Sequence, residues 1–328
     1  MSLTSIEICA GAGGQALGLE QAGFKHVALV EIEPLACATL KANRPDWNVI
    51  ESDVHSFSAK KYAGKIDLLA GGVPCPPFSV AGRQLGADDE RDLFPEALRL
   101  VSECKPRAVM LENVKGIFYP KFKEYREVIL GKLQDMGYRT CWRLIHANDY
   151  GVSQLRPRAL LVAIREPWAD AFVWPEPHPS DAISVGELLH DAMAAGGWSG
   201  ADAWARRADG IAPTIVGGSK KHGGADLGPT RSRKAWEALG VDGKGIVDEA
   251  PGSGFEGMPR LTVKMAALVQ GFPPEWNFSG RKTAAYRQVG NAFPPPVARA
   301  VGTSIKEALN GQPSGDVTRC SRAGLDAR

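Results

Sequence analysis

The chain has 328 residues, of which 44% are apolar and 23% are charged, a composition that supports a packed core of about two domains and excludes wholesale disorder. Lysine and arginine number 39 against 37 acidic residues, so the net charge of +2 excludes a polybasic chain and any nucleic-acid surface must be a local patch. The sequence has no bilayer-length apolar run, no basic segment before its first apolar run and no Cys-x-x-Cys pair. We therefore expect a cytoplasmic protein without membrane contact, disulfide framework or bound metal.

Strand and helix signals alternate through the first half of the chain, where short apolar runs are separated by stretches with helical spacing. The predicted strands are Ser5–Ala10, Val27–Ile32, Ile66–Gly71, Arg107–Asn113, Thr140–His146 and Ala159–Arg165. The predicted helices are Gln15–Ala22, Leu35–Lys41, a stretch that includes residues 93–101, and Phe122–Met136. This alternation predicts an α/β fold with a parallel, doubly wound, Rossmann-like sheet that carries helices on both faces.

The alternation stops at about residue 167, and the chain to about residue 259 is rich in Gly, Pro and Trp. Short pieces such as 212–216 have strand character there, so we expect a second, smaller, irregular and β-rich domain. Helical spacing returns at 263–269 and 296–309. The predicted boundaries are 1–180 for the first domain, completed by 281–310, then 181–280 for the second domain with its hinge, and 311–328 for a disordered tail.

A glycine-rich turn, Gly11-Ala12-Gly13-Gly14, joins the first predicted strand to the first predicted helix. Glycines there let the backbone turn sharply and approach a ligand closely. Glu31 follows about twenty residues later, at the end of the second strand, where it could hold ribose hydroxyls, and Asp53 could hold an amine on the base. Alone, the turn fits a nucleoside site and an ordinary helix entry about equally well.

Cys75 follows the predicted strand Ile66–Gly71 and is flanked by Pro74, Pro76 and Pro77. The prolines stiffen a loop at the carboxyl edge of the sheet, which is where open α/β sheets bind ligands. A buried structural cysteine does not call for such a loop, so we favour a nucleophile that acts as its thiolate. The polar residues 80–91 that follow are either a plain surface loop or a segment that closes over the substrate.

Glu112 lies at the end of the next strand, on the same sheet edge as Cys75, where it could donate a proton or a hydrogen bond. An isolated strand-end glutamate more often forms an ion pair or is solvated. The triplet Gln154-x-Arg156-x-Arg158 precedes the last strand and decides little alone.

Taken together, these motifs resemble those of the C5-cytosine DNA methyltransferases, from Ser5 to about Gly302 and interrupted only by the middle region. The matching blocks, in the order of that family, are ICAGAGG (8–14), VEIEP (30–34), SDV (52–54), GGVPCPPFS (71–79), RDLF (91–94), LENVKG (111–116), QLRPR (154–158), RLTVKMAALVQGFP (260–273) and YRQVGNAFPPPVA (286–298). Two positions depart from the usual pattern: Cys9, where an aromatic residue generally packs by the cofactor, and Pro76, often Gln.

The resemblance implies S-adenosylmethionine as the cofactor and assigns a role to each matching position. Gly11, Ala12 and Gly14 would line its methionine part, Glu31 would hold the ribose, and Asp53 would accept a hydrogen bond from the adenine. Ile32 and Val54 would lie on either side of the adenine. The remaining implied pocket residues are Cys9, Pro74, Leu93 and Asn291. Cys75 would be the nucleophile and Glu112 the acid, while Arg158, with Arg156, would position a cytosine flipped out of duplex DNA.

Target reading is expected in the middle region. Residues 217–236 contain a basic patch, formed by Lys220, Lys221, Arg231, Arg233 and Lys234 against the single acid Asp226. We expect the two lysines at 220 and 221 to meet phosphates and the two arginines to read bases. Ser79, Arg83 and Gln84 are the expected DNA contacts after the nucleophile. Without the family resemblance, the patch would be taken for a solvated loop.

Three alternatives remain open on the sequence. A nicotinamide-dependent oxidoreductase would explain the glycine turn but not the proline-flanked Cys75, and a non-catalytic DNA-binding protein would not need Glu112 and Arg158. A tRNA-modifying member of the same family is disfavoured because its Cys-Phe-Thr signature is missing. The expected enzyme is a monomer that acts on double-stranded DNA, and a cognate restriction endonuclease acting separately is compatible with it.

Overall fold

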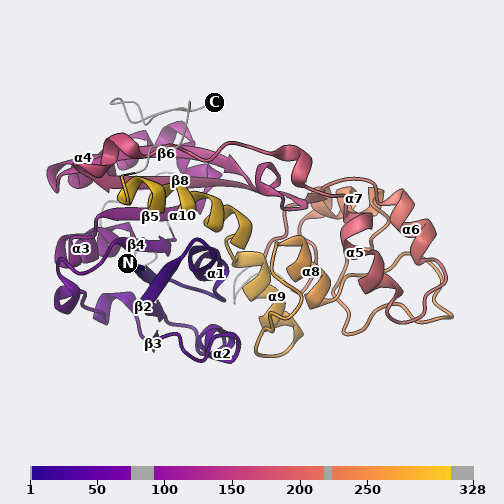
Figure 1. The fold of residues 1–328 in the computed structure, drawn as a ribbon. Coiled ribbons are helices and arrows are strands. Elements are labelled where there is room, and N and C mark those ends of the chain that lie inside the picture. The colour runs from indigo at the N-terminus through magenta and orange to yellow at the C-terminus, as the bar shows by residue number, and fades with distance from the viewer. Residues whose placement is uncertain (1, 75–91, 218–223, 312–328) are drawn as a thin grey trace.

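A seven-stranded sheet forms the centre of the computed structural model, which describes residues 2–74, 92–217 and 224–311 (Figure 1). Its strands are β1 (Leu3–Ile8), β2 (Phe24–Glu31), β3 (Val49–Glu51), β4 (Leu68–Gly72), β5 (Ala108–Val114), β6 (Tyr138–His146) and β8 (Pro157–Arg165). Their order is β3-β2-β1-β4-β5-β8-β6, and every pair from β3 to β5 is parallel.

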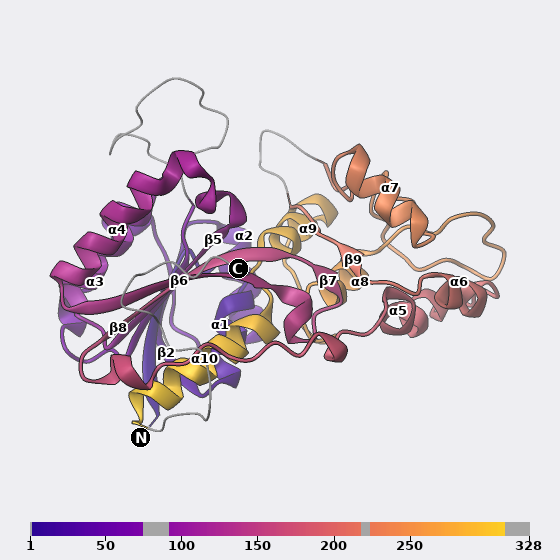
Figure 2. The same cartoon turned by 90° about the horizontal axis from the view of Figure 1, so that it is seen from above.

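Helices cover both faces of this sheet. Their bounds are α1 (Gly14–Gln21), α2 (Pro34–Asn43), α3 (Phe94–Cys104), α4 (Lys123–Asp135) and α10 (Pro295–Leu309). Apolar side chains of α3 and α4 share one core with one face of the sheet, while α1 and α10 pack on the other face. Figure 2 shows the two layers on opposite sides of the strands. The predicted doubly wound α/β architecture is confirmed.

Strands β6 and β8 depart from the all-parallel sheet that we expected. Strand β8 pairs antiparallel with both β5 and β6, so the sheet is mixed. Only a short 3-10 turn and the two-residue strand β7 (Gln154–Leu155) separate β6 from β8. A parallel return needs a long crossover connection, which this segment lacks.

The prediction of a β-rich middle region is wrong for the part of it that the structure describes. This part contains the helices α5 (Val185–Ala194), α6 (Ala201–Arg207), α7 (Thr230–Ala238) and α8 (Val263–Val269), and its only strand is β9 (Ala212–Pro213), paired with β7. Buried tryptophans anchor the short helices, Trp204 on α6 and Trp236 on α7. Helix α7 buries only that one residue, so its sequence carries no repeating apolar face.

Helix α9 (Lys282–Asn291) brings the chain back to the edge of the sheet, and it too was missed from the sequence. The segment before it is tied to the first domain. The Trp276 indole N–H donates to the Ala12 carbonyl at 3.2 Å, and the Asn43 side chain exchanges two hydrogen bonds with the Asn277 backbone. Among the helices in the described ranges, none is long and apolar enough to span a membrane.

Candidate active site

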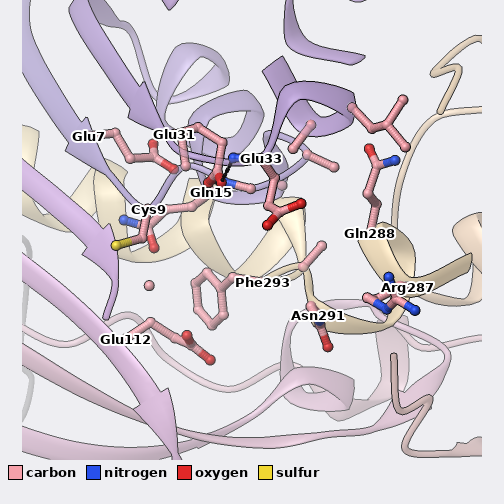
Figure 3. A pocket seen from close by; sticks show the side chains of 18 of the residues that line it. Glu7, Cys9, Gln15, Glu31, Glu33, Glu112, Arg287, Gln288, Asn291 and Phe293 are labelled. Carbon is pink, nitrogen blue, oxygen red and sulfur yellow. Dashed lines mark hydrogen bonds between the residues drawn. The ribbon is translucent and has the colours of Figure 1, made fainter. Parts of the chain in front are cut away.

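A cavity of about 670 Å³ opens at the carboxyl edge of β1, β2, β4 and β5, and helix α9 closes its far wall (Figure 3). Its lining residues are Glu7, Cys9, Ala10, Gly11, Ala12, Gly14, Gln15, Glu31, Glu33, Pro34, Leu35, Ala36, Gly72, Glu112, Ala284, Arg287, Gln288, Asn291, Ala292 and Phe293. The cavity therefore joins the glycine turn, the two strand-end glutamates and the returning C-terminal segment.

The glycine turn is shaped by close packing against that returning segment. A Cβ atom on Gly14 would lie 2.1 Å from the Phe293 carbonyl oxygen, so only glycine fits there. Gly13 has a φ of 87°, and its Cβ would meet the side chains of Leu40 and Trp276. The turn is thus pressed between α2 and the C-terminal segment, with its backbone exposed to the cavity.

Glu31 is held rigidly at the end of β2. One carboxylate oxygen accepts from the Gly11 N–H at 2.7 Å, and the other accepts from the N–H groups of Ile32 and Glu33 at 2.9 and 2.8 Å. The side chain is buried and lines the cavity. Such an anchored carboxylate is suited to accept hydrogen bonds from a ligand's hydroxyl groups.

The predicted cofactor residues fall into two groups. Cys9, Gly11, Ala12, Gly14, Glu31 and Asn291 line the cavity, whereas Ile32, Asp53, Val54, Pro74 and Leu93 are not part of its lining. Asp53 uses one carboxylate oxygen to accept from both the backbone and the ring nitrogen of His55, at 2.9 and 2.7 Å. These hydrogen bonds lower the pKa of Asp53. Pro74 and Leu93 are joined by a backbone hydrogen bond of 3.2 Å.

Glu112 and Arg158 form an ion pair beside the cavity. Glu112 extends from β5, and one of its oxygens lies 2.8 Å from Nε of Arg158 on the adjacent β8. Burial raises the pKa of Glu112 even though the arginine opposes this shift. Gly72 permits the close approach of β4, since a Cβ there would lie 3.3 Å from the other Glu112 oxygen. The carboxyl group can therefore hold a proton while facing the cavity.

Arg156 is brought near this pair but makes its hydrogen bonds elsewhere. Its fully buried guanidinium group donates to the carbonyl oxygens of Ile215, Gly290 and Ala292 at 2.7, 2.8 and 3.0 Å. It thereby joins β8 to the middle region and to the end of α9. Any influence of Arg156 on a bound base would pass through the backbone that it holds.

The predicted nucleophile Cys75 lies outside the described residues, as do Ser79, Arg83, Gln84, Lys220 and Lys221 and the segments around them. The strand that leads to Cys75 is fixed by Asn113, whose side-chain amide donates to the Val73 carbonyl at 2.8 Å. The sheet edge before residue 75 therefore meets the end of β5 next to Glu112.

The described part of the basic patch lies on helix α7. Arg231 is exposed and Arg233 is half-buried there, and Arg233 and Lys234 line a separate hollow with Lys244 and Met258. The Thr214 hydroxyl donates to the Leu155 carbonyl at 2.5 Å, which fixes the start of the segment that leads to this patch.

Several cavity residues were missed by the sequence reasoning. They are Glu7, Gln15, Glu33, Arg287, Gln288 and Phe293. A signal was available for Glu7, because a charged residue in the middle of a buried strand is unusual. Cys9 has a φ of 51° and lies beside Glu7 and Glu31. Burial is the largest of the effects that raise the pKa of the Cys9 thiol to about 12, so the thiol stays protonated at neutral pH.

The mixed α/β sheet, with a glycine turn after its first strand and a cavity at the carboxyl edge, places the chain in the doubly wound α/β class, whose members bind ligands at that edge. The family model of the C-5 cytosine-specific DNA methylases matches residues 3–307. The chain belongs to this family and is a DNA (cytosine-5-)-methyltransferase, an enzyme that needs DNA and a methyl donor.

Individual relatives agree with this assignment. The chain is 58% identical over 315 residues to the Type II methyltransferase M.NaeI of Lentzea aerocolonigenes, covering 94% of this chain and 76% of the relative. It is 57% identical over 312 residues to M.NgoMIV of Neisseria gonorrhoeae, covering 94% and 99%. A putative DNA modification methyltransferase encoded within an E. coli prophage shares the fold, with a TM-score of 0.66 and 24% identity over 94% of this chain and all of that one.

Proposed function

We propose that this enzyme transfers a methyl group from S-adenosylmethionine to C5 of a cytosine flipped out of a specific duplex sequence. The observation that carries the proposal is the shared cavity. The anchored Glu31, the glycine turn and Glu112, which Arg158 holds, all face one space, so a nucleoside donor and a target base can meet there.

The cavity residues fit this donor. The Glu31 carboxylate can accept from ribose hydroxyls, and the buried polar side chains of Glu7 and Gln15 have atoms without partners among the residues that the structure describes. When bound, S-adenosylmethionine supplies an electrophilic methyl group on a sulfonium. The chain's own part is to orient that group toward the sheet edge that carries Glu112 and to exclude water.

Cytosine C5 is too weak a nucleophile without activation, and Cys75 would supply it. Its thiolate forms a bond to C6, which shifts electron density to C5. Glu112, protonated or sharing a proton with N3 of the ring, stabilises that density, and Arg158 fixes the orientation of Glu112. Once C5 carries the methyl group, loss of its proton is coupled to cleavage of the sulfur–carbon bond, which restores both the aromatic ring and the free cysteine.

Base flipping is required because C6 is inaccessible in a stacked duplex, and it costs a few kcal/mol, which contacts in the cleft offset. We assign target reading to residues 181–280, with Arg231 and Arg233 as base-reading candidates on α7. Residues 1–180 and 281–310 would form the catalytic domain, whereas the tail predicted for 311–328 lies, after residue 311, outside the described residues. As in a Type II modification enzyme, the monomer would act in the bacterial cytoplasm, separately from any cognate restriction endonuclease.

The test combines product mapping with covalent trapping. The enzyme is incubated with S-adenosylmethionine and mixed-sequence DNA, and bisulfite sequencing should locate 5-methylcytosine at one sequence. Duplex DNA with 5-fluorocytosine at that site should form a stable adduct with the wild type and none with Cys75→Ser, because the fluorine cannot leave as the proton does.

The acid is tested by Glu112→Gln, with Glu127→Gln on the exposed face of α4 as the control. The Glu112 variant should lose about 10²- to 10⁴-fold in methyl transfer while the control stays at the wild-type rate. Substantial turnover by Cys75→Ser, or no 5-methylcytosine with the wild type, would overturn the proposed reaction.

A further inference from the structure

Two buried side chains at the inner end of the cavity have polar atoms without a partner in the described part of the chain. Gln15, in the first turn of α1, is 3% exposed, and both atoms of its amide lack a hydrogen-bond partner among the described residues. The same holds for Oε2 of Glu7 on β1, which is 1% exposed. Figure 3 shows Glu7, Cys9 and Gln15 grouped on one side of the cavity, across Phe293 from Arg287.

Leaving such atoms unpaired is costly. A buried amide or carboxyl group without a partner destabilises a protein by about 1–3 kcal/mol, and an apolar side chain of similar shape would avoid this cost. Gln15 is buried together with Ala16 and Leu17 of α1, so its amide is not a solvated surface group. Gln15 is therefore a poor choice for stability alone, and its amide requires a polar group that enters the cavity.

We propose that Gln15 recognises the α-amino-acid end of the methyl donor, an inference that rests on the proposed function. The amide offers one donor and one acceptor side by side, which matches the carboxylate and the ammonium of an amino acid. Oε2 of Glu7 adds a further polar atom beside this amide. The nucleoside end has its own anchor in Glu31, whose two oxygens are already fixed by three backbone N–H groups.

The place of Gln15 in the cavity supports assigning Gln15 to the amino-acid end of the donor and Glu31 to its nucleoside end. Gln15 stands with Cys9 on the side of β1 and β4, and the cavity continues from there to Gly72 and Glu112. The donor's sulfur must lie near Glu112 for methyl transfer, and the amino-acid chain is attached to that sulfur. The amino acid is therefore the part of the donor whose place in the cavity is closest to Gln15.

The experiment compares two ligands that differ only in this part. Titration calorimetry measures S-adenosylhomocysteine and 5′-methylthioadenosine, which lacks the amino acid, against the wild type, Gln15→Leu and the control Gln21→Leu at the exposed end of the same helix. Gln15→Leu should weaken S-adenosylhomocysteine about 10- to 150-fold, as loss of hydrogen bonds to charged groups predicts. Binding of 5′-methylthioadenosine should change less than about threefold, and Gln21→Leu should match the wild type for both ligands.

Thermal denaturation without ligand separates recognition from a structural role. Gln15→Leu should melt at or above the wild-type temperature, because it removes two unpaired polar atoms. A lower melting temperature, equal losses for both ligands, or unchanged S-adenosylhomocysteine binding would each overturn the inference. If the wild type bound neither ligand, the proposed cofactor itself would be wrong, and the inference would fall with it.

Discussion

Replacing Arg156 by methionine should destabilise the junction between the sheet, the middle region and helix α9. The guanidinium group is fully buried and donates to the carbonyl oxygens of Ile215, Gly290 and Ala292. Ala292 keeps a second donor, the side-chain amide of Gln270, so two carbonyls lose a strong partner. At about 1–3 kcal/mol for each carbonyl, the cost is roughly 2–6 kcal/mol.

The assay is thermal denaturation with Arg139→Met as the matched control. An unfolding entropy near 2.1 cal/mol/K per residue converts the cost into a drop of about 3–9 °C for a 328-residue chain. Arg139 pairs with Glu166 and Asp170, whose side chains are 56% and 80% exposed, so its loss should cost at most about 1 kcal/mol. Cofactor affinity should also fall in Arg156→Met, because Arg156 holds the carbonyls of Gly290 and Ala292, the residues on either side of Asn291 in the cavity wall.

Arg156→Lys should recover little of this stability, since one ammonium group on a flexible stem cannot reproduce a planar fork that reaches three carbonyls. If Arg156→Met melted within about 1.5 °C of the wild type, as expected for Arg139→Met, the buried guanidinium would not organise the junction and the reasoning would be refuted.

Two further predictions concern Glu7 and Gly290. Burial and the charge of Glu31 raise the pKa of Glu7 above its ordinary 4.5, so the folded protein holds a proton at Glu7 that the unfolded chain releases, and the wild type loses stability as the pH rises above 4.5. Glu7→Gln has no such proton, so its stability should gain on that of the wild type by up to about 1.36 kcal/mol per pH unit above that value. A constant difference in melting temperature between the two proteins from pH 5 to 8 would contradict this. A Cβ on Gly290 would lie 2.3 Å from the backbone nitrogen of Gly217, so Gly290→Ala should lower the free energy of unfolding by denaturant by about 1–3 kcal/mol. The control Gly131→Ala lies in open space on α4 and should raise it by about 0.5–1 kcal/mol. If both substitutions stabilised the protein, the backbones of Gly290 and Gly217 would not be in close contact.

Most of the sheet could be predicted because six of its seven strands carry their own signal, whereas no range was predicted for the three-residue β3. Apolar runs such as residues 66–71 and 107–113 are buried on both faces, so the sequence alone marks them, and β4 and β5 lie there. Glu31 and Glu112 were found for the same reason. A charged residue at the end of a buried strand points to the carboxyl edge of the sheet, and both side chains line the cavity.

Gln15 and Arg156 could not be assigned in this way. Within the pattern of α1, Gln15 has the appearance of an ordinary polar helix residue, and nothing local shows that its amide is buried without a partner. The family resemblance implied that Arg156, with Arg158, positions a base, yet the partners of Arg156 are 59 to 136 residues away along the chain. Both environments are created by tertiary packing alone.

Helix α9 shows why the far wall of the cavity, apart from Asn291, was not predicted from the sequence. One side of this helix presents Arg287, Gln288 and Asn291 to the cavity, while Tyr286 and Val289 are buried in the same core as α5 to α8. The buried side of this ten-residue helix holds only Ala285, Tyr286, Val289 and Gly290, a stripe too short for a local pattern to reveal. Because one helix serves as cavity wall and as part of the middle-region core, any displacement of that core relative to the sheet must change the shape of the cavity.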